Sequence, residues 1–233
     1  MTTKTLEKFA IPLSIIFAGI LIGVAVIITN KPATSSIAGV ATEVDLMTEL
    51  TKNPVVKQLK IKEKELVACI EGETTSGKVQ NDMQLANQAG LRGTPHMVAI
   101  MPNGDQFPLF GALPKEMILS AVTEGKTPAE QAEMVEANIP QQIITENDHV
   151  RGNRDTALAT IVEYSDIDCP YCKQLHSTLQ QLVNEGKIAW VYRHSPIEQL
   201  HPMAYTKSIA SECVANLSNT EGFWKYIDSM MKN

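Results

Sequence analysis

Residues 160–193 read TIVEYSDIDCPYCKQLHSTLQQLVNEGKIAWVYR, and this stretch decides the fold class of the chain. Its two ends are rich in β-branched and aromatic side chains, which favour strands. Between them, apolar residues recur at helical spacing, and Cys172, Leu175 and Leu179 fall on one face. The pattern predicts a strand, a helix over 169–185 and a second strand, with a connection long enough for a parallel, right-handed crossover.

Two cysteines stand where the first strand gives way to the helix, in the sequence Cys169-Pro170-Tyr171-Cys172. Unpaired amide groups at a helix N-terminus favour a thiolate, so Cys169 is predicted to be the nucleophile. Cys172 lies on the stripe that faces the core and is predicted to be the resolving thiol. The pair predicts thiol-disulfide exchange. Whether it oxidises, reduces or isomerises disulfides depends on its reduction potential and its partner.

Two acidic residues precede the cysteine pair, and their charge opposes the stabilisation of the Cys169 thiolate by the helix N-terminus. Asp166 and Asp168 place negative charge just before Cys169, and Tyr171 supplies no cationic imidazole between the cysteines. Negative charge near a thiol disfavours its thiolate. The sequence leaves the sum of these opposing effects open.

The same cysteines permit a second hypothesis, a tethered metal- or thiol-binding protein. Cys169, Cys172 and His176 would supply three ligands of types that zinc accepts. The sequence contains no second paired cluster to complete a tetrahedral site, and Pro170 inside the pair favours the redox interpretation. We therefore expect no metal and no bound cofactor, since the redox group is the cysteine pair itself.

The composition fits one folded domain and a membrane segment. Of the 233 residues, 44% are hydrophobic, which is enough to build a proper core. The formal charge is -6 and the pI is near 5.4, with Lys and Arg scattered among acidic residues. These values argue against a broad basic surface, so we expect no nucleic-acid partner.

Residues 9–30, FAIPLSIIFAGILIGVAVIITN, carry no charge and are long enough to cross the hydrocarbon core of a membrane. Lys4 and Lys8 precede this segment, which favours a cytoplasmic N-terminus and an exported body, although Lys31 weakens the bias. We therefore expect a single-pass protein of the cell membrane.

The segment divides the chain into a cytoplasmic stub with its anchor, residues 1–30, and a part outside the cytoplasm. Residues 31–42 are small and mostly uncharged, as expected of a tether. A signal peptide cleaved near residues 39–41 is the alternative to a retained anchor. In either case the catalytic domain is expected to be extracytoplasmic, in the periplasm or on the outer face of the membrane.

The segments outside residues 160–193 predict helices and one hairpin. The expected elements are helices over 43–90, strands over 97–101 and 106–110, a helix over 115–124, a linker over 127–145 and helices from 201 to 233. Pro108 marks the second hairpin strand as a sheet edge, because proline cannot donate to a ladder. Pro114 and Gly125 are suited to begin and end the helix between them.

Several of these motifs resemble bacterial DsbA-like oxidoreductases, which have the thioredoxin fold. The residues that resemble the start of that family are DHVRGN (148–153), TIVEYSD (160–166), CPYC (169–172), YRH (192–194) and HP (201–202). Those that resemble its C-terminal portion are ACIEG (68–72), GTP (93–95) and the hairpin and helix that follow. The resemblance implies an α/β, thioredoxin-like fold with a helical insertion, and disulfide formation or exchange in exported, cysteine-containing proteins. It leaves open whether a membrane reoxidase is the redox partner.

The order of the two portions departs from the family. The C-terminal-type portion, residues 43–126 (the first half), precedes the N-terminal-type portion, residues 146–233 (the second half). Joining Asn233 to the region near Glu43 would restore the family order, which implies a circular permutation cut inside the helical insertion. The alternative is a catalytically weak remnant of a gene fusion, whose halves must find their complements in other molecules.

The linker between the halves permits closure within one chain. About 20 residues span up to roughly 70 Å when extended, more than the width of a small domain. The length-dependent entropic cost is only about 3 kcal/mol. We therefore expect a monomer with one permuted domain, followed by a domain-swapped dimer as the next hypothesis.

The resemblance also assigns roles to residues of the first half. It implies that Pro95 is a cis-proline packed against Cys169, and that Thr94 offers its backbone to an extended substrate segment. Pro170 and Tyr171 would line the same groove. An X-Pro bond is the only economical place for a cis peptide. An ordinary turn before a strand is the alternative for the Thr94-Pro95 segment.

The two remaining cysteines lie one in each half. Cys69 and Cys213 are predicted to form a disulfide, because an exported chain with an even number of cysteines favours pairing. By resemblance, both fall in the helical insertion, where some members of the family carry a second, structural bridge. Two buried free thiols are the alternative, since cysteine packs well as a small apolar side chain.

A few further residues carry simpler expectations. His194 and His201 match family positions and are expected to be structural hydrogen-bonding residues rather than acid-base catalysts. Trp190, Phe223 and Trp224 are expected to lie in the core or in a pocket wall.

Overall fold

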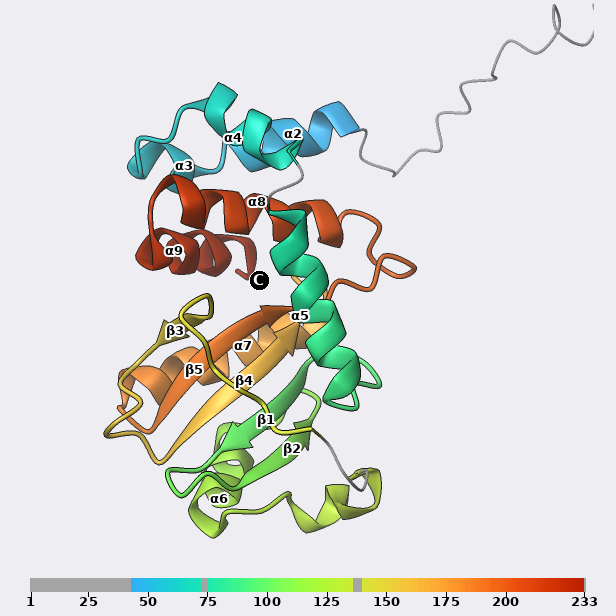
Figure 1. Ribbon diagram of the computed structural model, residues 1–233, viewed down its shortest axis with the longest axis vertical. Helices are drawn as coiled ribbons and strands as arrows, with labels where there is room; N and C mark the ends of the chain where they lie inside the picture. Colours follow the sequence, from blue (N-terminus) through green and yellow to red (C-terminus); the bar gives the residue numbers. More distant parts are fainter. Residues whose placement is uncertain (1–42, 73–74, 136–139, 233) are drawn as a thin grey trace, which may run out of the picture. The chain divides into compact units, whose positions relative to one another are not determined.

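A mixed sheet joins strands from the two halves of the chain (Figure 1). The computed structural model describes residues 43–72, 75–135 and 140–232, so the predicted membrane span, residues 9–30, lies outside the described residues. The strands are β1 (His96–Ile100), β2 (Gln106–Phe110), β3 (His149–Arg151), β4 (Ala159–Ser165) and β5 (Ile188–His194), in the sheet order β2-β1-β4-β5-β3. Strand β1 of the first half runs antiparallel to β4 of the second half, so the sheet is complete only when both halves contribute.

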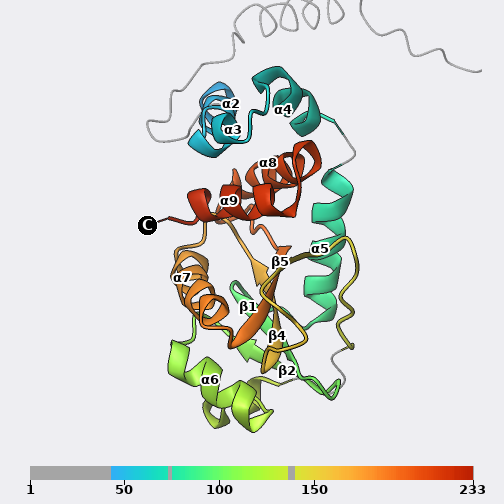
Figure 2. The same cartoon turned by 90° about the vertical axis from the view of Figure 1, so that its left-hand side faces the viewer.

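Helices cover both faces of this sheet and form a separate cluster beyond one end (Figures 1 and 2). The α-helices are α2 (Glu43–Thr51), α3 (Pro54–Gln58), α4 (Glu63–Ile70), α5 (Ser76–Gln88), α6 (Lys115–Glu124), α7 (Pro170–Asn184), α8 (Ala204–Leu217) and α9 (Thr220–Met230). Helices α6 and α7 pack on one face of the sheet, and α5 packs on the other (Figure 2). Helices α2, α3 and α4 of the first half pack against α8 and α9 of the second.

The strand, helix and strand predicted around the cysteines are confirmed as β4, α7 and β5. Strands β4 and β5 pair in parallel over their whole length. Cys169 caps the N-terminus of α7 and Pro170 occupies its first turn, where a missing amide hydrogen costs nothing. The predicted apolar stripe faces the core, with Cys172, Leu175 and Leu179 fully buried. The second half thus positions the cysteine pair at the carboxyl end of a buried strand.

The predicted hairpin is confirmed as β1 and β2, and β2 is the edge strand that Pro108 indicated. The side chain of Gln131 pairs with the free edge of β2: Phe110 N–H donates to Oε1 at 3.0 Å, and Nε2 donates to the Phe110 carbonyl at 2.7 Å. Gln131 belongs to a short 3-10 helix, η1 (Ala129–Met134).

The predicted linker, residues 127–145, is therefore held against the sheet where it is described, and it is not a free tether. Besides Gln131, Thr127 donates from Oγ1 to the Pro108 carbonyl at 2.9 Å. Gln142 is buried and exchanges two hydrogen bonds with the Gln106 side chain, at 2.7 and 2.9 Å. Amide side chains replace the strand partner that β2 lacks, a long-range role that local sequence patterns do not indicate.

Two smaller features differ from the sequence expectations. Strand β3 follows the linker and pairs antiparallel with β5; its three residues are too few to give a strand pattern. On α8, Ala210, Cys213 and Val214 are buried, whereas Leu217 at the end of the helix is 39% exposed.

A disulfide ties the first half to the second within the helical cluster. Cys69 of α4 and Cys213 of α8 are bonded, with their Cα atoms 5.8 Å apart, which confirms the predicted pairing. The start and the end of the described chain also meet there. Asn53, which caps α3, donates from Nδ2 to Ser229 Oγ of α9 at 2.8 Å. Trp190, Phe223 and Trp224 are buried in the core, as expected.

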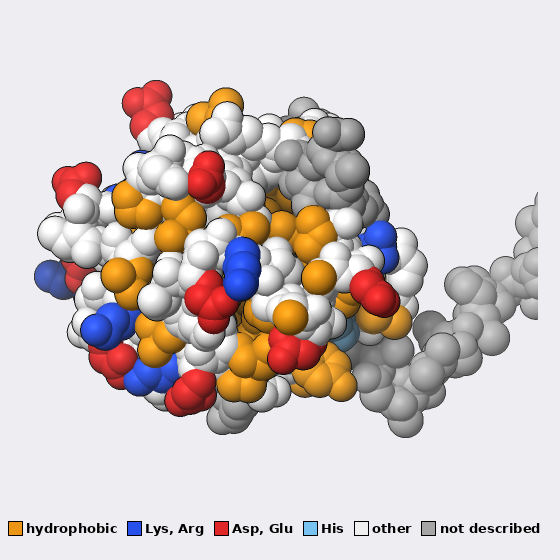
Figure 3. Space-filling model, turned by 90° about the horizontal axis from the view of Figure 1, so that it is seen from below, with side chains coloured by type: hydrophobic (Ala, Val, Ile, Leu, Met, Phe, Trp, Pro, Cys, Tyr) orange, Lys and Arg blue, Asp and Glu red, His pale blue; other side chains and the backbone are white. Residues whose placement is uncertain are grey.

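The surface mixes charges of both signs with hydrophobic side chains. On the face seen from the α6 end, acidic and basic side chains alternate around hydrophobic ones (Figure 3). Within the described ranges, 43–72, 75–135 and 140–232, no helix combines the length and the apolar character needed to cross a membrane.

Candidate active site

The first cysteine of the pair sits at the junction of β4, α7 and the loop before β1. Cys169 is 5% exposed, although its neighbours Pro170 and Tyr171 are exposed, Tyr171 by 64%. Its backbone N–H donates to the Asp166 carbonyl at 3.1 Å, which closes a tight turn between strand and helix. A single sulfur atom is thus presented at the base of a surface formed by exposed motif residues.

The surroundings of Cys169 stabilise its thiolate. The pKa of Cys169 is lowered from 9.0 to about 5, chiefly by a hydrogen bond from the Cys172 side chain. Burial acts against this shift, and hydrogen bonds from the backbone N–H groups of Cys172 and Tyr171 add to it. These amides belong to the first turn of α7, so the helix N-terminus supplies the donors that the sequence predicted. The lowered pKa favours the thiolate form of Cys169 at neutral pH.

Cys172 has the opposite character. It is fully buried, and burial raises its pKa well above the usual range, assisted by the Cys169 interaction and by the charge of Glu163. Its Sγ accepts a hydrogen bond from the Asp166 backbone N–H at 3.4 Å. The pair thus combines one sulfur with a lowered pKa, next to the exposed residues Pro170 and Tyr171, and one fully buried sulfur with a raised pKa. A nucleophilic and a resolving thiol require this asymmetry.

The first half supplies the residues that face Cys169. The Thr94-Pro95 peptide bond is cis, as the resemblance implied. The Thr94 carbonyl lies 3.6 Å from Cys169 Sγ. Pro95 is buried and Thr94 half-buried, directly before β1. The Thr94-Pro95 segment therefore lies beside the sulfur that directly precedes Pro170 and Tyr171, although about 75 residues separate Thr94 from Cys169 in sequence.

A buried carboxyl group below the pair escaped the sequence analysis. Glu163 is fully buried on β4, and Trp190 Nε1 of β5 donates to its Oε2 at 2.9 Å. Burial raises the pKa of Glu163 from 4.5 to about 7, and the nearby Cys169 charge adds to this effect. A carboxyl group with that pKa exchanges a proton readily at neutral pH. The only available signal in the sequence was an acidic residue inside an otherwise apolar strand.

The third ligand of the metal hypothesis points elsewhere. His176 Nε2 lies 2.9 Å from Asp228 Oδ1 of α9, and the imidazole packs edge-on against Trp190. Asp228 also accepts two hydrogen bonds from Arg151. Among the residues with described positions, Cys169, Cys172 and His176 do not form a group whose ligand atoms converge.

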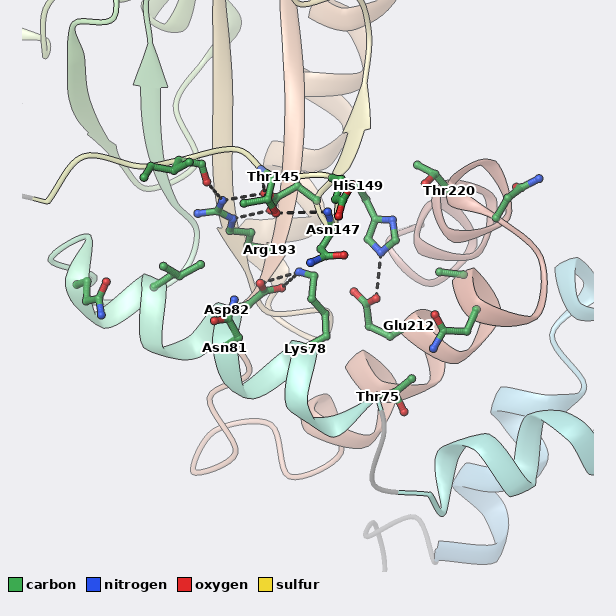
Figure 4. Close-up of a pocket in the computed structure, with 18 of the residues that line it drawn as sticks. Thr75, Lys78, Asn81, Asp82, Thr145, Asn147, His149, Arg193, Glu212 and Thr220 are labelled. Atoms are coloured by element: carbon green, nitrogen blue, oxygen red, sulfur yellow. Dashed lines mark hydrogen bonds and ion pairs between the residues drawn. The ribbon is translucent and has the colours of Figure 1, made fainter.

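A second cluster of titratable groups lies in an open polar hollow of about 1020 Å³ between α5, the segment before β3 and α8 (Figure 4). Asp82, His194 and Glu212 offer ligand atoms within 4.8 Å of one another. Lys78 Nζ, however, already contacts both Asp82 oxygens, at 2.6 and 2.7 Å. The ammonium group therefore occupies the position that a bound cation would need.

Other titratable side chains of this cluster are also paired with one another. Glu212 bridges His149 at 3.0 Å and His194 at 2.9 Å; although burial opposes it, these contacts hold the pKa of Glu212 well below its usual range. Arg193 pairs with Asp148 (Figure 4). The hydrogen-bonding role expected for His194 agrees with these contacts. The cluster joins α5 of the first half to β3, β5 and α8 of the second.

Comparison with known proteins supports this description of the second half. Residues 144–233 match a family model described as thioredoxin. This half of the chain is thioredoxin-like. It contains strands β3, β4 and β5 of the sheet, helix α7 and the cysteine pair. A thioredoxin-like domain suggests thiol-disulfide oxidoreductase activity.

The curated relatives match only a part of this chain, and that part is about as long as the second half. The chain is 37% identical over 87 residues to "Na(+)/H(+) antiporter NhaA 3" of Salinispora tropica, which is 37% of this chain and 13% of that protein. It is 36% identical over 85 residues to "Na(+)/H(+) antiporter NhaA 1" of Mycolicibacterium gilvum, which is 36% of this chain and 14% of that protein. The chain thus spans about an eighth of the length of these relatives, so their names carry no information on ion transport by this chain.

Proposed function

We propose that the chain is a DsbA-like, membrane-anchored thiol-disulfide oxidoreductase that acts outside the cytoplasm on cysteine-containing exported proteins. The observation that carries the proposal is the asymmetry of the pair. Cys169 has a pKa of about 5 and faces the Thr94-Pro95 segment, whereas Cys172 is buried with a raised pKa. Because the reduced form gains a stable thiolate, the couple favours oxidation of substrates.

The proposed reaction moves two electrons from a substrate dithiol to the enzyme disulfide. A substrate thiolate attacks Cys169 Sγ, the Cys169–Cys172 bond breaks, and Cys172 leaves with the electron pair and takes a proton. The second substrate thiolate then attacks the substrate sulfur of the mixed disulfide, and Cys169 leaves as its stable thiolate. The products are a substrate disulfide and the reduced pair.

Glu163 is the proposed proton donor for Cys172. Its pKa of about 7 keeps it partly protonated at neutral pH, and its charge acts directly on Cys172. In the reverse direction the same carboxylate would accept the Cys172 proton and so activate the buried thiol.

A circular permutation is the proposed origin of the chain order. The Thr94-Pro95 loop, the hairpin and α6 come before the cysteine motif in sequence, yet β1 pairs with the motif strand β4. The ends that the permutation would join lie together, since Asn53 hydrogen-bonds to Ser229 at 2.8 Å. Closure of both halves within one chain favours a monomer over a swapped dimer or a fusion remnant.

The proposed location rests on two independent features. The uncharged residues 9–30 would provide the anchor. The Cys69–Cys213 disulfide suits an oxidising compartment, where such bonds persist. A membrane reoxidase that restores the Cys169–Cys172 disulfide is part of the proposal.

The test combines a thiol titration with a turnover assay. Iodoacetamide should alkylate Cys169 with a pH midpoint near 5, as read by mass spectrometry of the peptide. The oxidised protein should also introduce disulfides into a reduced, unfolded secretory protein, with recovery of that protein's activity. A midpoint near 9 together with no oxidation of the substrate would refute the proposal.

A further inference from the structure

Two carboxylates stand next to a thiolate that the structure nevertheless stabilises. Asp166 and Asp168 precede Cys169 in sequence, and negative charge close to a thiol disfavours its ionised form. The neighbours of these carboxylates therefore decide how strongly they oppose the thiolate.

Asp166 is fully buried and engaged by polar groups on both oxygens. Oδ1 accepts from the Asp168 backbone N–H at 2.8 Å. Oδ2 accepts from the Ile197 backbone N–H at 2.7 Å and lies 3.0 Å from His201 Nδ1. This carboxylate fixes the turn before Cys169 and the loop that leads to α8. Its charge is spread over three hydrogen-bond donors.

Asp168 has a different partner, a full positive charge from α8. Lys207 Nζ lies 2.8 Å from Asp168 Oδ1, and the two side chains are only 14% and 22% exposed. Half-buried pairs are screened less by water and salt than surface pairs. Glu49 of α2 lies farther from the same ammonium, at 3.7 Å, and is 54% exposed.

Helix α8 is held from the side of the first half. The Cys69–Cys213 disulfide joins it to α4, and Cys213 lies six residues, about 9 Å, along the helix from Lys207. The ammonium is therefore presented to the motif loop by a helix with a fixed position.

We propose that Lys207 is a positioning residue that neutralises Asp168 and thereby sets the reduction potential of the Cys169–Cys172 couple. This inference rests on the proposed function. With Lys207 in place, the Asp168 carboxylate destabilises the Cys169 thiolate only slightly. Without it, the thiolate faces an uncompensated negative charge, the reduced state is less stable, and the enzyme is a weaker oxidant.

The measurement is the redox equilibrium of the full chain with glutathione. Oxidised enzyme and two glutathione thiols give the reduced pair and one glutathione disulfide, so no other oxidant is needed. Acid quenching, alkylation and mass spectrometry give the oxidised fraction of the 169–172 peptide at each glutathione ratio. The pH midpoint of Cys169 alkylation provides a second readout.

Four variants test the Lys207–Asp168 pair. Lys207→Met keeps most of the apolar stem and removes the charge, so the equilibrium constant should shift about three- to tenfold against the reduced pair, with a higher Cys169 midpoint. Asp168→Asn leaves Lys207 with only the more distant and more exposed Glu49, and it should shift both values in the opposite direction. The double variant Lys207→Met with Asp168→Asn should return close to the parent protein, and Lys207→Arg should preserve the parent values.

Lys225→Met is the matched control. Lys225 pairs with Glu221 on the exposed face of α9, with side chains 40% and 72% exposed. This variant should leave the equilibrium unchanged. Equal shifts in Lys207→Met and Lys225→Met, or no shift in Lys207→Met, would overturn the inference. If the parent protein itself shows no exchange with glutathione, the proposed function fails instead, so the two failures are distinct.

Discussion

The first and second halves of the chain contribute unequally to the same site. The second half contains both cysteines of the motif, Cys169 and Cys172, and matches the thioredoxin family model over residues 144–233. The first half has neither of those sulfurs, yet it supplies the Thr94 carbonyl 3.6 Å from Cys169 and two strands of the sheet. Reactive atoms can thus be recognised in one contiguous segment, whereas the surface that faces them comes from a distant one.

Removing the sulfur atoms gives the largest expected effect and tests the role of the second half. Cys169→Ser should lower the rate of substrate oxidation by at least about 10³-fold, because serine cannot form the mixed disulfide. The assay is reactivation of a reduced secretory protein. The control is the double variant Cys69→Ala with Cys213→Ala, which removes the two cysteines outside the motif. Comparable turnover in Cys169→Ser and the parent protein would contradict the assignment.

The same double variant measures how strongly the disulfide ties the halves together. Cys69 and Cys213 are 144 residues apart in sequence, so their bond restricts the unfolded chain substantially. Its removal should lower the free energy of unfolding by about 2–5 kcal/mol, as read from denaturant titration. The pH midpoint of Cys169 alkylation should stay the same at temperatures where the variant is folded. An unchanged unfolding midpoint would mean that the halves are held by packing alone.

Glu163 gives a pH-dependent effect on stability. Its folded pKa of about 7 exceeds the ordinary 4.5, so the unfolded chain loses this proton first as the pH rises. Stability from this group is present below pH 4.5 and is lost as the pH rises to 7. Glu163→Gln has no carboxyl group that could lose a proton. Its free energy of unfolding, relative to that of the parent protein, should therefore rise by about 3 kcal/mol between pH 4.5 and pH 7.

The control for Glu163 is Glu133→Gln, at an exposed position of η1. Its stability relative to the parent should not change with pH. A difference between Glu163→Gln and the parent that is flat from pH 4 to 8 would show that Glu163 is not a perturbed acid.

Cutting the linker should have the smallest effect. A protease site inserted between Met134 and Val135, both exposed, allows cleavage after folding. The halves should stay together through the β1–β4 pairing and the disulfide, and turnover should change by no more than about twofold. An uncut sample of the same variant is the control. Separation of the fragments on gel filtration without reductant would contradict closure within one chain.

The sequence predicted the elements whose evidence is local. The β4-α7-β5 unit, the hairpin and the helix after Pro114 follow from periodicity and from proline and glycine positions, and the structure confirms them. The Cys69–Cys213 bond and the cis peptide before Pro95 were also predicted, with support from a family resemblance.

The features that the sequence did not reveal depend on contacts between distant residues. Gln131 and Gln142 look like ordinary linker residues until they bond to β2. Glu163 looks like any strand residue until the fold buries it and brings Trp190 within hydrogen-bond distance. Lys207 is one of many helical lysines, and only the fold brings it to Asp168.

The central claim is that both halves form one substrate-binding site around Cys169. Cys169 of Cys172→Ser should attack a peptide that carries a disulfide, expel the other sulfur as a thiolate and stay linked to the peptide as a mixed disulfide. Hydrogen-deuterium exchange of that complex then reports which backbone amides the peptide covers. The account predicts slower exchange at residues 93–96 of the first half as well as around residue 171. Protection confined to the second half, with exchange at 93–96 unchanged, would contradict it.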